Sequence, residues 1–556
     1  MKEIKLKKAN TILFLIVFSV IFSGFDVNAA ENDLPFVVPN IKAPKFPNKD
    51  FIITKYGAIG DGQKKNAAAF AKAIEACSKA GGGKVVVPAG IWLTGPIQLK
   101  SNINLHLEEG ALILFSENFE DYPIIRSTSG GIPEVRCMSP IFGENLNNIA
   151  ITGTGIIDGS GQAWRPVKKS KLTESQWEKL LASGGVVDEN NKIWYPSKEA
   201  MNGHNTVRRL DAKNADLQEY AAARQYLRPV MVSLVECKNI LLDGPTFQNS
   251  PNWNIHPLLC ENMIVQNITV RNPWFSQNGD GLDPESCKNL IIRNCRFDVG
   301  DDAICMKSGK DEYGRKRGKA TENVAIENCI VYHGHGGFVI GSEMSGDVRN
   351  VYVRNCTFIG TDVGIRFKTT RGRGGIVENI YIQDIRMKDI PEDAILFTMY
   401  YTGNVFIPMN DEESDYGKNV PAASEETPRF EKIYMKNIIC DGAKRAIHIQ
   451  GLPEMAIRDI SLENAVIAAD NGVTCIEAEN IKFKKCKIIP AASPTFKLFN
   501  SKNLVLEDVT VPDSIESFMR LAGNETEQIE LRGFDKSIAG KIQSGKKVKP
   551  DAIIIK

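Results

Sequence analysis

The stretch NMIVQNITVRNPWFSQNGDGLDPESCKNLII, residues 262–292, contains the pattern that decides the fold. It begins and ends with the same unit, an asparagine followed by an apolar residue, any residue and a second apolar residue: NMIV at 262 and NLII at 289. Apolar residues two positions apart lie on one face of a strand, and the residue between them faces the other way. Each unit therefore predicts a short strand with one buried face.

The unit recurs along most of the chain, with Lys or Asp replacing the asparagine in two copies. The twelve copies are NINL at 102, NIAI at 148, NILL at 239, NMIV at 262, NLII at 289, NVAI at 323, NVYV at 350, NIYI at 379, KIYM at 432, DISL at 459, NIKF at 480 and NLVL at 503. Many spacings lie between 21 and 34 residues, the length of one coil of a parallel β-helix. Leucine-rich repeats would show a leucine-dominated consensus, and a propeller blade needs about 40 residues or more.

The cysteines follow the same period. Three lie two positions before a unit, at 237, 260 and 287, and four lie six positions after one, at 295, 329, 356 and 486. Stacked coils bring equivalent residues about 4.8 Å apart. That distance would allow disulfides, but repeated use of one position favours a ladder of small apolar side chains in the core. We therefore expect unpaired thiols.

The N-terminus predicts export. A basic start is followed by the apolar run TILFLIVFSVIFSGF and by small residues ending at Ala29, which is typical of a secretory signal peptide over residues 1–29. We expect residues 30–556 to form one catalytic domain in the periplasm or outside the cell. No later stretch is apolar enough to cross a bilayer, so no membrane partner is expected. The net charge of +1 argues against a nucleic-acid partner.

Three further segments interrupt or cover the repeat. NAAAFAKAIEACSKA, residues 66–80, predicts a helix with Asn66 at its N-cap and glycines after its end, which would cap the first coil. Residues 162–228 form an insertion with helical patterns, and residues 410–426 form a polar, acidic loop. On a solenoid, insertions lie in loops beside the working face.

Four short motifs fall in consecutive coils: NGD at 278, GDD at 300, GHG at 334 and RFK at 366. Stacking would bring them together. Carboxylates held close together shift one another's pKa, so that one can stay protonated as an acid while another stays ionised to activate water. For Asp301 and Asp302 alone, a solvent-exposed turn is the simpler alternative. Adjacent strand residues also point to opposite faces, so these two carboxylates can share a cleft only if the chain turns at Gly300.

With these motifs the chain resembles the polygalacturonases of glycoside hydrolase family 28, whose signatures are Asn-Thr-Asp, Gly-Asp-Asp, Gly-His-Gly and Arg-Ile-Lys in this order. The resemblance runs from about Tyr56 to beyond Tyr401 and includes YGAIGDG and VVVPAGIWLTGPIQL. It implies an all-β, right-handed, single-stranded parallel β-helix of the pectin-lyase type. It also implies hydrolysis of α-1,4-linked galacturonic acid in a pectic polysaccharide or oligogalacturonide. Gly279 and Phe367 depart from the signatures, which leaves hydrolysis intact and affects only fine specificity.

The resemblance also implies roles for individual residues. Asp301 would be the general acid, and Asp280 and Asp302 would activate the water, with inversion and carboxyl groups about 6.5–9.5 Å apart. His335 would hold a catalytic carboxylate. No metal and no cofactor are expected, because the chain lacks a Cys/His pattern with ligand spacing.

Another set of residues is expected to contact the substrate. Arg366 and Lys368 lie on one strand face and suit a uronate carboxylate. Arg371 and Arg373 either extend this basic patch or decorate a loop, and His256 either stacks on a sugar with Trp253 or fills the core. One of two adjacent tyrosines would match a late family tyrosine. The full set is Asn278, His256, Arg366, Lys368, Arg371, Arg373, Tyr400 and Tyr401.

Several alternatives stay open. A rhamnogalacturonan or xylogalacturonan hydrolase would share these motifs. A Ca²⁺-dependent pectate lyase would share the fold, the acids and the basic residues, and a non-catalytic carbohydrate-binding β-helix would share the fold without needing aligned catalytic groups. We expect a monomer that acts on chain ends, because the insertion at 162–228 can close one end of the cleft.

Overall fold

The computed structural model describes residues 36–401, 403 and 416–556. The predicted signal peptide, and residues 410–415 of the predicted acidic loop, lie outside the described residues. Phe36–Lys556 form one compact unit. Within the described ranges, none of the helices combines the length and apolar character needed to span a membrane.

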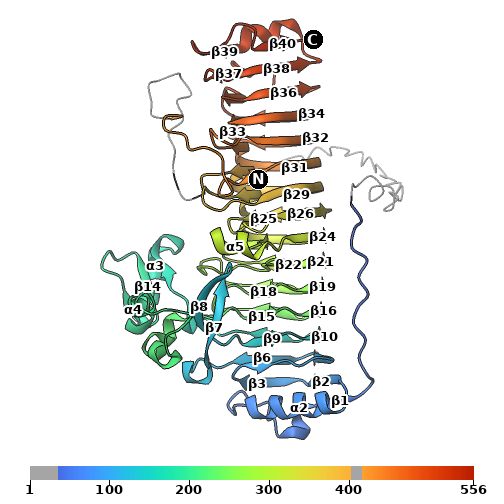
Figure 1. The fold of residues 1–556 in the computed structure, drawn as a ribbon, viewed down its shortest axis with the longest axis vertical. Helices are drawn as coiled ribbons and strands as arrows, with labels where there is room; N and C mark the ends of the chain where they lie inside the picture. Colours follow the sequence, from blue (N-terminus) through green and yellow to red (C-terminus); the bar gives the residue numbers. More distant parts are fainter. Residues whose placement is uncertain (1–35, 402, 404–415) are drawn as a thin grey trace, which may run out of the picture. The chain divides into compact units, whose positions relative to one another are not determined.

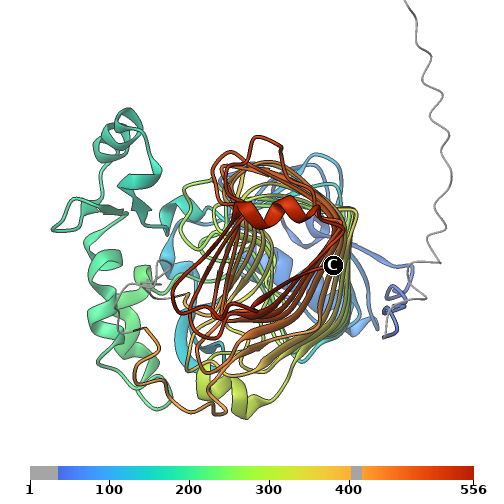
Figure 2. The same ribbon diagram turned by 90° about the horizontal axis from the view of Figure 1, so that it is seen from above.

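The predicted parallel β-helix is confirmed: successive coils stack along one axis, and their strands pair in parallel (Figures 1 and 2). The repeated unit forms the first ladder of strands. Its strands are β2 (Gly83–Val87), β5 (Ile103–Leu107), β10 (Asn147–Gly153), β16 (Lys238–Asp243), β19 (Glu261–Gln266), β21 (Lys288–Arg293), β24 (Thr321–Glu327), β26 (Val348–Arg354), β29 (Ile376–Thr398), β31 (Ile433–Gln450), β32 (Ile457–Ala469), β34 (Ala478–Pro490), β36 (Lys502–Glu507), β38 (Glu527–Arg532) and β40 (Ile553–Ile555).

Two other ladders complete each coil. The second comprises β3 (Gly90–Thr94), β6 (Ala111–Phe115), β11 (Ile156–Asp158), β17 (Thr246–Gln248), β20 (Thr269–Arg271), β22 (Arg296–Asp298), the start of β25 (Ile330–Gly341), β27 (Thr357–Ile359) and later parts of the long strands β29, β31, β32 and β34. The third comprises β4 (Ile97–Gln98), β9 (Ile141–Glu144), β15 (Val232–Val235), β18 (Ile255–Leu258), β23 (Asp302–Met306), the end of β25, β28 (Thr361–Lys368), the ends of β29 and β31, β33 (Asn471–Ile476), β35 (Phe496–Phe499), β37 (Met519–Ala522) and β39 (Ile542–Ser544). The third ladder carries the GDD, GHG and RFK motifs.

The asparagine that opens each unit has a structural cause. Asn262, Asn289 and Asn323 have φ of 58°, 59° and 58°, a left-handed conformation that asparagine tolerates better than most residues. Each also donates from Nδ2 to the Oδ1 of the asparagine one coil earlier, for example Asn289 to Asn262 at 3.0 Å and Asn323 to Asn289 at 3.1 Å. The repeat is therefore a turn signal and a hydrogen-bonded ladder at once.

The core is continuous along the stack. In the unit at 289, Leu290 and Ile292 are buried and pair with Met263 and Val265 of the previous coil, which are also buried. All twelve cysteines are buried and free, so the expectation of unpaired thiols is confirmed. Several share the same position in neighbouring coils, and this extends the apolar stack.

The N-terminal helix is α2 (Ala67–Lys79), which packs over the first coil as predicted (Figure 1). Asn66 is at the N-cap position, but its side chain makes no capping hydrogen bond. Its side-chain amide instead forms hydrogen bonds with backbone groups of Ile59, Lys64 and Leu93. These bonds provide hydrogen-bond partners for those backbone groups.

The insertion, residues 162–228, contains α3 (Glu174–Ala182), α4 (Lys198–Val207) and the 3₁₀ segment η5 (Leu217–Tyr226), with a small sheet of β12 (Val167–Lys168), β13 (Val186–Val187) and β14 (Ile193–Tyr195). It lies beside the coils, next to the hairpin of β7 (Ile124–Ser129) and β8 (Ile132–Cys137) (Figure 1). Trp164 and Tyr220 of the insertion pack with Tyr122, just before that hairpin, in one buried cluster. Another short helix, α5 (Asp311–Arg317), follows β23.

Candidate active site

The carboxylate cluster consists of Asp280, Asp301 and Asp302. Each contributes an oxygen, and these oxygens all lie within 4.8 Å of one another. Asp302 begins β23, Asp301 lies in the turn before it, and Asp280 lies in the loop one coil earlier. Asp280 and Asp302 are buried, whereas the side chain of Asp301 is 19% exposed. The stacking of coils thus brings together motifs that lie about 20 residues apart.

Glycines make this turn possible. A Cβ at Gly300 would collide with Ser276 Oγ, and so would a Cβ at Gly279. The expected turn at Gly300 is present, and it lets the two adjacent aspartates share one site. The departure at Gly279 also has a cause, since Ser276 occupies the space that a threonine side chain would need.

Asp302 is held as an anion. Lys368 Nζ lies 2.6 Å from its Oδ2, and Arg366 Nη1 lies 3.4 Å from its Oδ1. Burial alone would raise the pKa of Asp302, but the positive charges of Lys368, Arg366 and Lys307 outweigh it and hold the pKa well below its usual range. Both partners come from the RFK motif on β28.

Asp280 has the opposite environment. Burial, together with repulsion from Asp301 and Asp283, raises its pKa well above its usual value, and its Oδ1 has no hydrogen-bond partner in the described structure. The cluster therefore contains one carboxyl that favours the protonated form and one that favours the ionised form. Neighbouring carboxyls with pKa values shifted in opposite directions are typical of sites that use acid and base catalysis.

His335 contacts the most exposed member of the cluster. Its Nδ1 lies 3.0 Å from Asp301 Oδ1, and its Nε2 lies 3.1 Å from Nζ of Lys171 in the insertion. Asp362 lies 3.7 Å from Nε2 on another side. Burial lowers the pKa of His335. The hydrogen bond to Asp301 and the charge of Asp301 raise the pKa by more than burial lowers it, so the net shift is upward.

The sequence did not reveal three residues at this site. Lys307 is buried, with its Nζ 3.6 Å from Asp283 Oδ1, 3.2 Å from Glu343 Oε2 and 4.6 Å from the ring centre of Trp253. Glu343 is the second residue and Lys171 is the third, which lies 164 positions from His335 in the sequence. Lys307 could have been suspected because it follows the GDD strand, but nothing local indicated Lys171 or Glu343.

Five of the eight predicted substrate residues form two groups. Arg366 and Lys368 face the cluster, and the ring of Tyr401 lies 6.0 Å and 4.8 Å from their charged ends. Tyr400 lies instead over Arg371, which is bonded through two nitrogens to Glu454 at 2.5 and 2.8 Å. Tyr401 is thus the tyrosine beside the basic pair.

Three predicted residues are engaged elsewhere. Arg373 is buried, pairs with Asp311 and donates to Ser342 O at 3.1 Å, so it does not extend an open basic patch. His256 is 5% exposed and bonds to Glu285 Oε2 at 3.0 Å, which matches the core alternative. Asn278 accepts a hydrogen bond of 3.0 Å from Arg228 at the end of the insertion.

A parallel β-helix that presents three neighbouring carboxyls, one of them buried beside two fixed cations, indicates a hydrolase of the carboxylate-dependent class. Comparisons agree with this class. The model of glycosyl hydrolases family 28 matches residues 200–410. A probable polygalacturonase of Vitis vinifera is 29% identical over 467 residues, covering 80% of this chain and 81% of the relative.

Two further relatives have exo-acting names. An exo-poly-alpha-D-galacturonosidase of Dickeya chrysanthemi is 32% identical over 360 residues, which are 63% of this chain and 57% of the relative. The crystal structure of a hyperthermoactive exopolygalacturonase from Thermotoga maritima superposes with a TM-score of 0.66 at 31% identity, covering 84% of this chain and 94% of that one. The chain belongs to glycoside hydrolase family 28.

Proposed function

We propose that this glycoside hydrolase is an exo-acting polygalacturonase that cleaves α-1,4-linked galacturonic acid from the ends of pectic chains. The observation that carries the proposal is the carboxylate cluster with Lys368 and Arg366 beside it, a set of acids and cations suited to a polyuronate. The names of the relatives from Dickeya chrysanthemi and Thermotoga maritima support both the substrate class and the exo mode.

In the proposed mechanism Asp301 donates its proton to the oxygen of the departing sugar. It is the most exposed member of the cluster, and His335 at 3.0 Å stabilises the carboxylate that results. Asp280 and Asp302 hold the attacking water. Water oxygen bonds to the anomeric carbon, the bond from that carbon to the departing oxygen breaks, and the released proton goes to the Asp302 carboxylate, because Asp302 is the member of the pair that is held ionised. The base then loses this proton to solvent, and solvent returns a proton to Asp301.

The separation of the carboxyls bears on stereochemistry. The nearest oxygens lie within 4.8 Å, which is shorter than the separation of about 6.5–9.5 Å expected for inversion and nearer to the range of about 5–5.5 Å typical of retention. A water bonded to two carboxylate oxygens at about 2.8 Å each nevertheless spans roughly 4.5 Å between them. Water therefore fits between the nearest oxygens, and we propose inversion.

Proton NMR during the first turnovers tests this step. Inversion of an α-linkage releases the β-anomer first, and the α-anomer accumulates only by mutarotation. Release of the α-anomer first would show a covalent intermediate and would overturn the assignment of Asp280 and Asp302 to water activation.

The exo mode is supported by the insertion's contacts with the coils that carry the cluster. Lys171 reaches His335 at 3.1 Å, and Arg228 bonds to Asn278 at 3.0 Å and to the carbonyl of Gln277 at 3.2 Å. A folded segment anchored at these points can wall one end of the cleft. The early product profile from a long oligogalacturonide is the test: one small product from the first time point agrees, whereas a ladder of intermediate lengths refutes the exo mode.

Two assays separate the alternatives. Equal or faster release of products from rhamnogalacturonan or xylogalacturonan would move the substrate away from homogalacturonan. Ultraviolet absorbance from an unsaturated product would indicate elimination, not hydrolysis. We also propose that the chain is exported and acts as a monomer; sequencing of the mature N-terminus and the mass in solution check these two points.

A further inference from the structure

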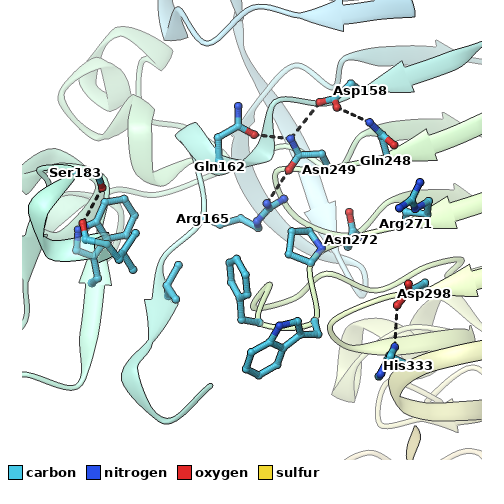
Figure 3. A pocket seen from close by; sticks show the side chains of 16 residues that line it. Asp158, Gln162, Arg165, Ser183, Gln248, Asn249, Arg271, Asn272, Asp298 and His333 are labelled. Atoms are coloured by element: carbon cyan, nitrogen blue, oxygen red, sulfur yellow. Dashed lines mark hydrogen bonds and ion pairs between the residues drawn. The ribbon is translucent and has the colours of Figure 1, made fainter. Parts of the chain in front are cut away.

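We propose that a cavity between the insertion and the β-helix is a second sugar site, which binds a uronate unit outside the carboxylate cluster. The choice of uronate rests on the proposed function. The cavity has a volume of about 790 Å³, and neither Asp280, Asp301 nor Asp302 lines it. Figure 3 shows its walls, which come from the insertion and from the second ladder of strands. We refer to it as the lateral cavity.

One wall is a row of polar side chains at equivalent positions of successive coils. The register pairs Asp158 with Gln248, Gln248 with Arg271, Arg271 with Asp298, and Asp298 with His333. Coils lie about 4.8 Å apart, so the row is about 19 Å long and exceeds the length of a single sugar. A row of this kind offers donors and acceptors at regular intervals to hydroxyl groups.

Arg271 stands out in this row. Asp158 is occupied by Gln248 Nε2 at 2.8 Å and Asn249 Nδ2 at 3.1 Å, and Asp298 pairs with His333 at 3.0 Å (Figure 3). The side chain of Arg271, between them, makes no hydrogen bond or ion pair to any described residue. A guanidinium in this position can bind a carboxylate through two parallel hydrogen bonds.

Aromatic side chains also line the lateral cavity. Trp274 is 44% exposed and meets Phe275 edge to face at 5.8 Å, while Trp194 comes from the insertion. A single exposed tryptophan is ordinary on a protein surface. Here its ring shares a cavity with an unpaired guanidinium and a polar row, which is the pairing of apolar face and directed polar groups that a sugar ring requires.

Buried hydrogen bonds hold part of the cavity lining in place. Arg165 of the insertion is buried, donates to Asn249 Oδ1 at 2.7 Å and also bonds to Ser250 O. Asn272, another lining residue, donates to the carbonyls of Gly279 and Asp280 at 3.1 and 3.5 Å. The lateral cavity therefore shares a loop with the carboxylate cluster. Occupancy of the cavity would hold a part of the pectic chain that is not being cleaved.

Calorimetry on the full chain tests the site with galacturonic acid, which cannot be cleaved, and with galactose as the neutral match. We expect two binding events for galacturonic acid. Arg271→Met should weaken one of them about tenfold or more, because a charged hydrogen-bond partner is lost. Trp274→Ala should weaken the same event, and Trp274→Phe should largely retain it. Arg293→Met is the matched control, since Arg293 bonds to Gln266 on the first ladder.

Four outcomes decide the matter. Loss of one event in Arg271→Met but not in Arg293→Met supports the site. A single event in the wild type, with hydrolysis of oligogalacturonide intact, overturns the second site and leaves the proposed function standing. Equal binding of galactose and galacturonic acid overturns the uronate assignment. Binding that depends on Arg271 in a protein that does not hydrolyse galacturonan supports the site and defeats the proposed function.

Discussion

Replacement of Lys368 by methionine removes the closest partner of the Asp302 carboxylate. The two charged atoms lie 2.6 Å apart, and both side chains are nearly buried, at 6% and 1% exposure. Arg366 remains at 3.4 Å. Methionine keeps the length and apolar stem of lysine, so the variant tests the charge and leaves the packing.

The geometry sets the size of the effect. At 2.6 Å and an effective dielectric constant of about 20, the Coulomb attraction is about 6 kcal/mol. Removal of one partner of a buried pair typically lowers the stability by about 3–5 kcal/mol, because the other charge stays buried without its partner. The folded pKa of Asp302 is depressed, so its contribution to stability is present above the unfolded pKa of about 3.9 and is lost as the pH falls. The stability loss in Lys368→Met should therefore be largest near neutral pH and shrink as Asp302 takes up a proton.

The same change should appear in catalysis. Loss of the neighbouring cation raises the pKa of Asp302, so the acidic limb of the kcat profile should move to higher pH by about 1–3 units. Denaturant unfolding at two pH values and a pH–rate profile on trigalacturonate measure both effects. Lys388→Met is the control, since that lysine is 58% exposed and pairs with Asp441. A rise in KM with an unmoved acidic limb would refute this reasoning and indicate that Lys368 serves only to bind the substrate.

Four further predictions follow from the site and the core. Asp301→Asn should lower kcat about 10²- to 10⁴-fold with an unchanged circular dichroism spectrum, because the proton donor is lost without a change of shape; turnover near the wild-type rate would exclude Asp301 as the acid. Lys171→Met removes a positive charge 3.1 Å from His335 Nε2, so the pKa of His335 should rise and the limb of the pH–rate profile that reports it should move to higher pH, whereas Lys169→Met should leave it in place. Prolonged dialysis against EDTA should leave hydrolysis unchanged, since Lys368 and Arg366 already neutralise Asp302; loss of activity restored by Ca²⁺ would contradict this. Thiol titration should detect almost no reactive cysteine in the native protein and twelve after denaturation without reductant; fewer than twelve would reveal disulfides.

The sequence by itself determined the fold and the place of the cluster. The unit at 262 and 289 encodes a left-handed turn and a half-buried strand within four residues, so its repetition specifies stacked coils without long-range information. Because stacked coils bring equivalent positions together, the motifs at 278, 300, 334 and 366 could be assigned to one site. The turn at Gly300 followed from the same local chemistry.

Only the tertiary structure decided which groups neutralise or hold these residues. Lys171 approaches His335 because the long insertion folds back onto the β-helix. No local sequence pattern determines where such a segment packs. Arg373 was expected near the substrate but is buried and forms an ion pair with Asp311. Lys368 forms an ion pair with Asp302. Pairings of this kind depend on which opposite charge lies nearest after folding. The distance between two opposite charges is set by the packing of the whole chain, whereas the turn and strand signals are set by a few adjacent residues.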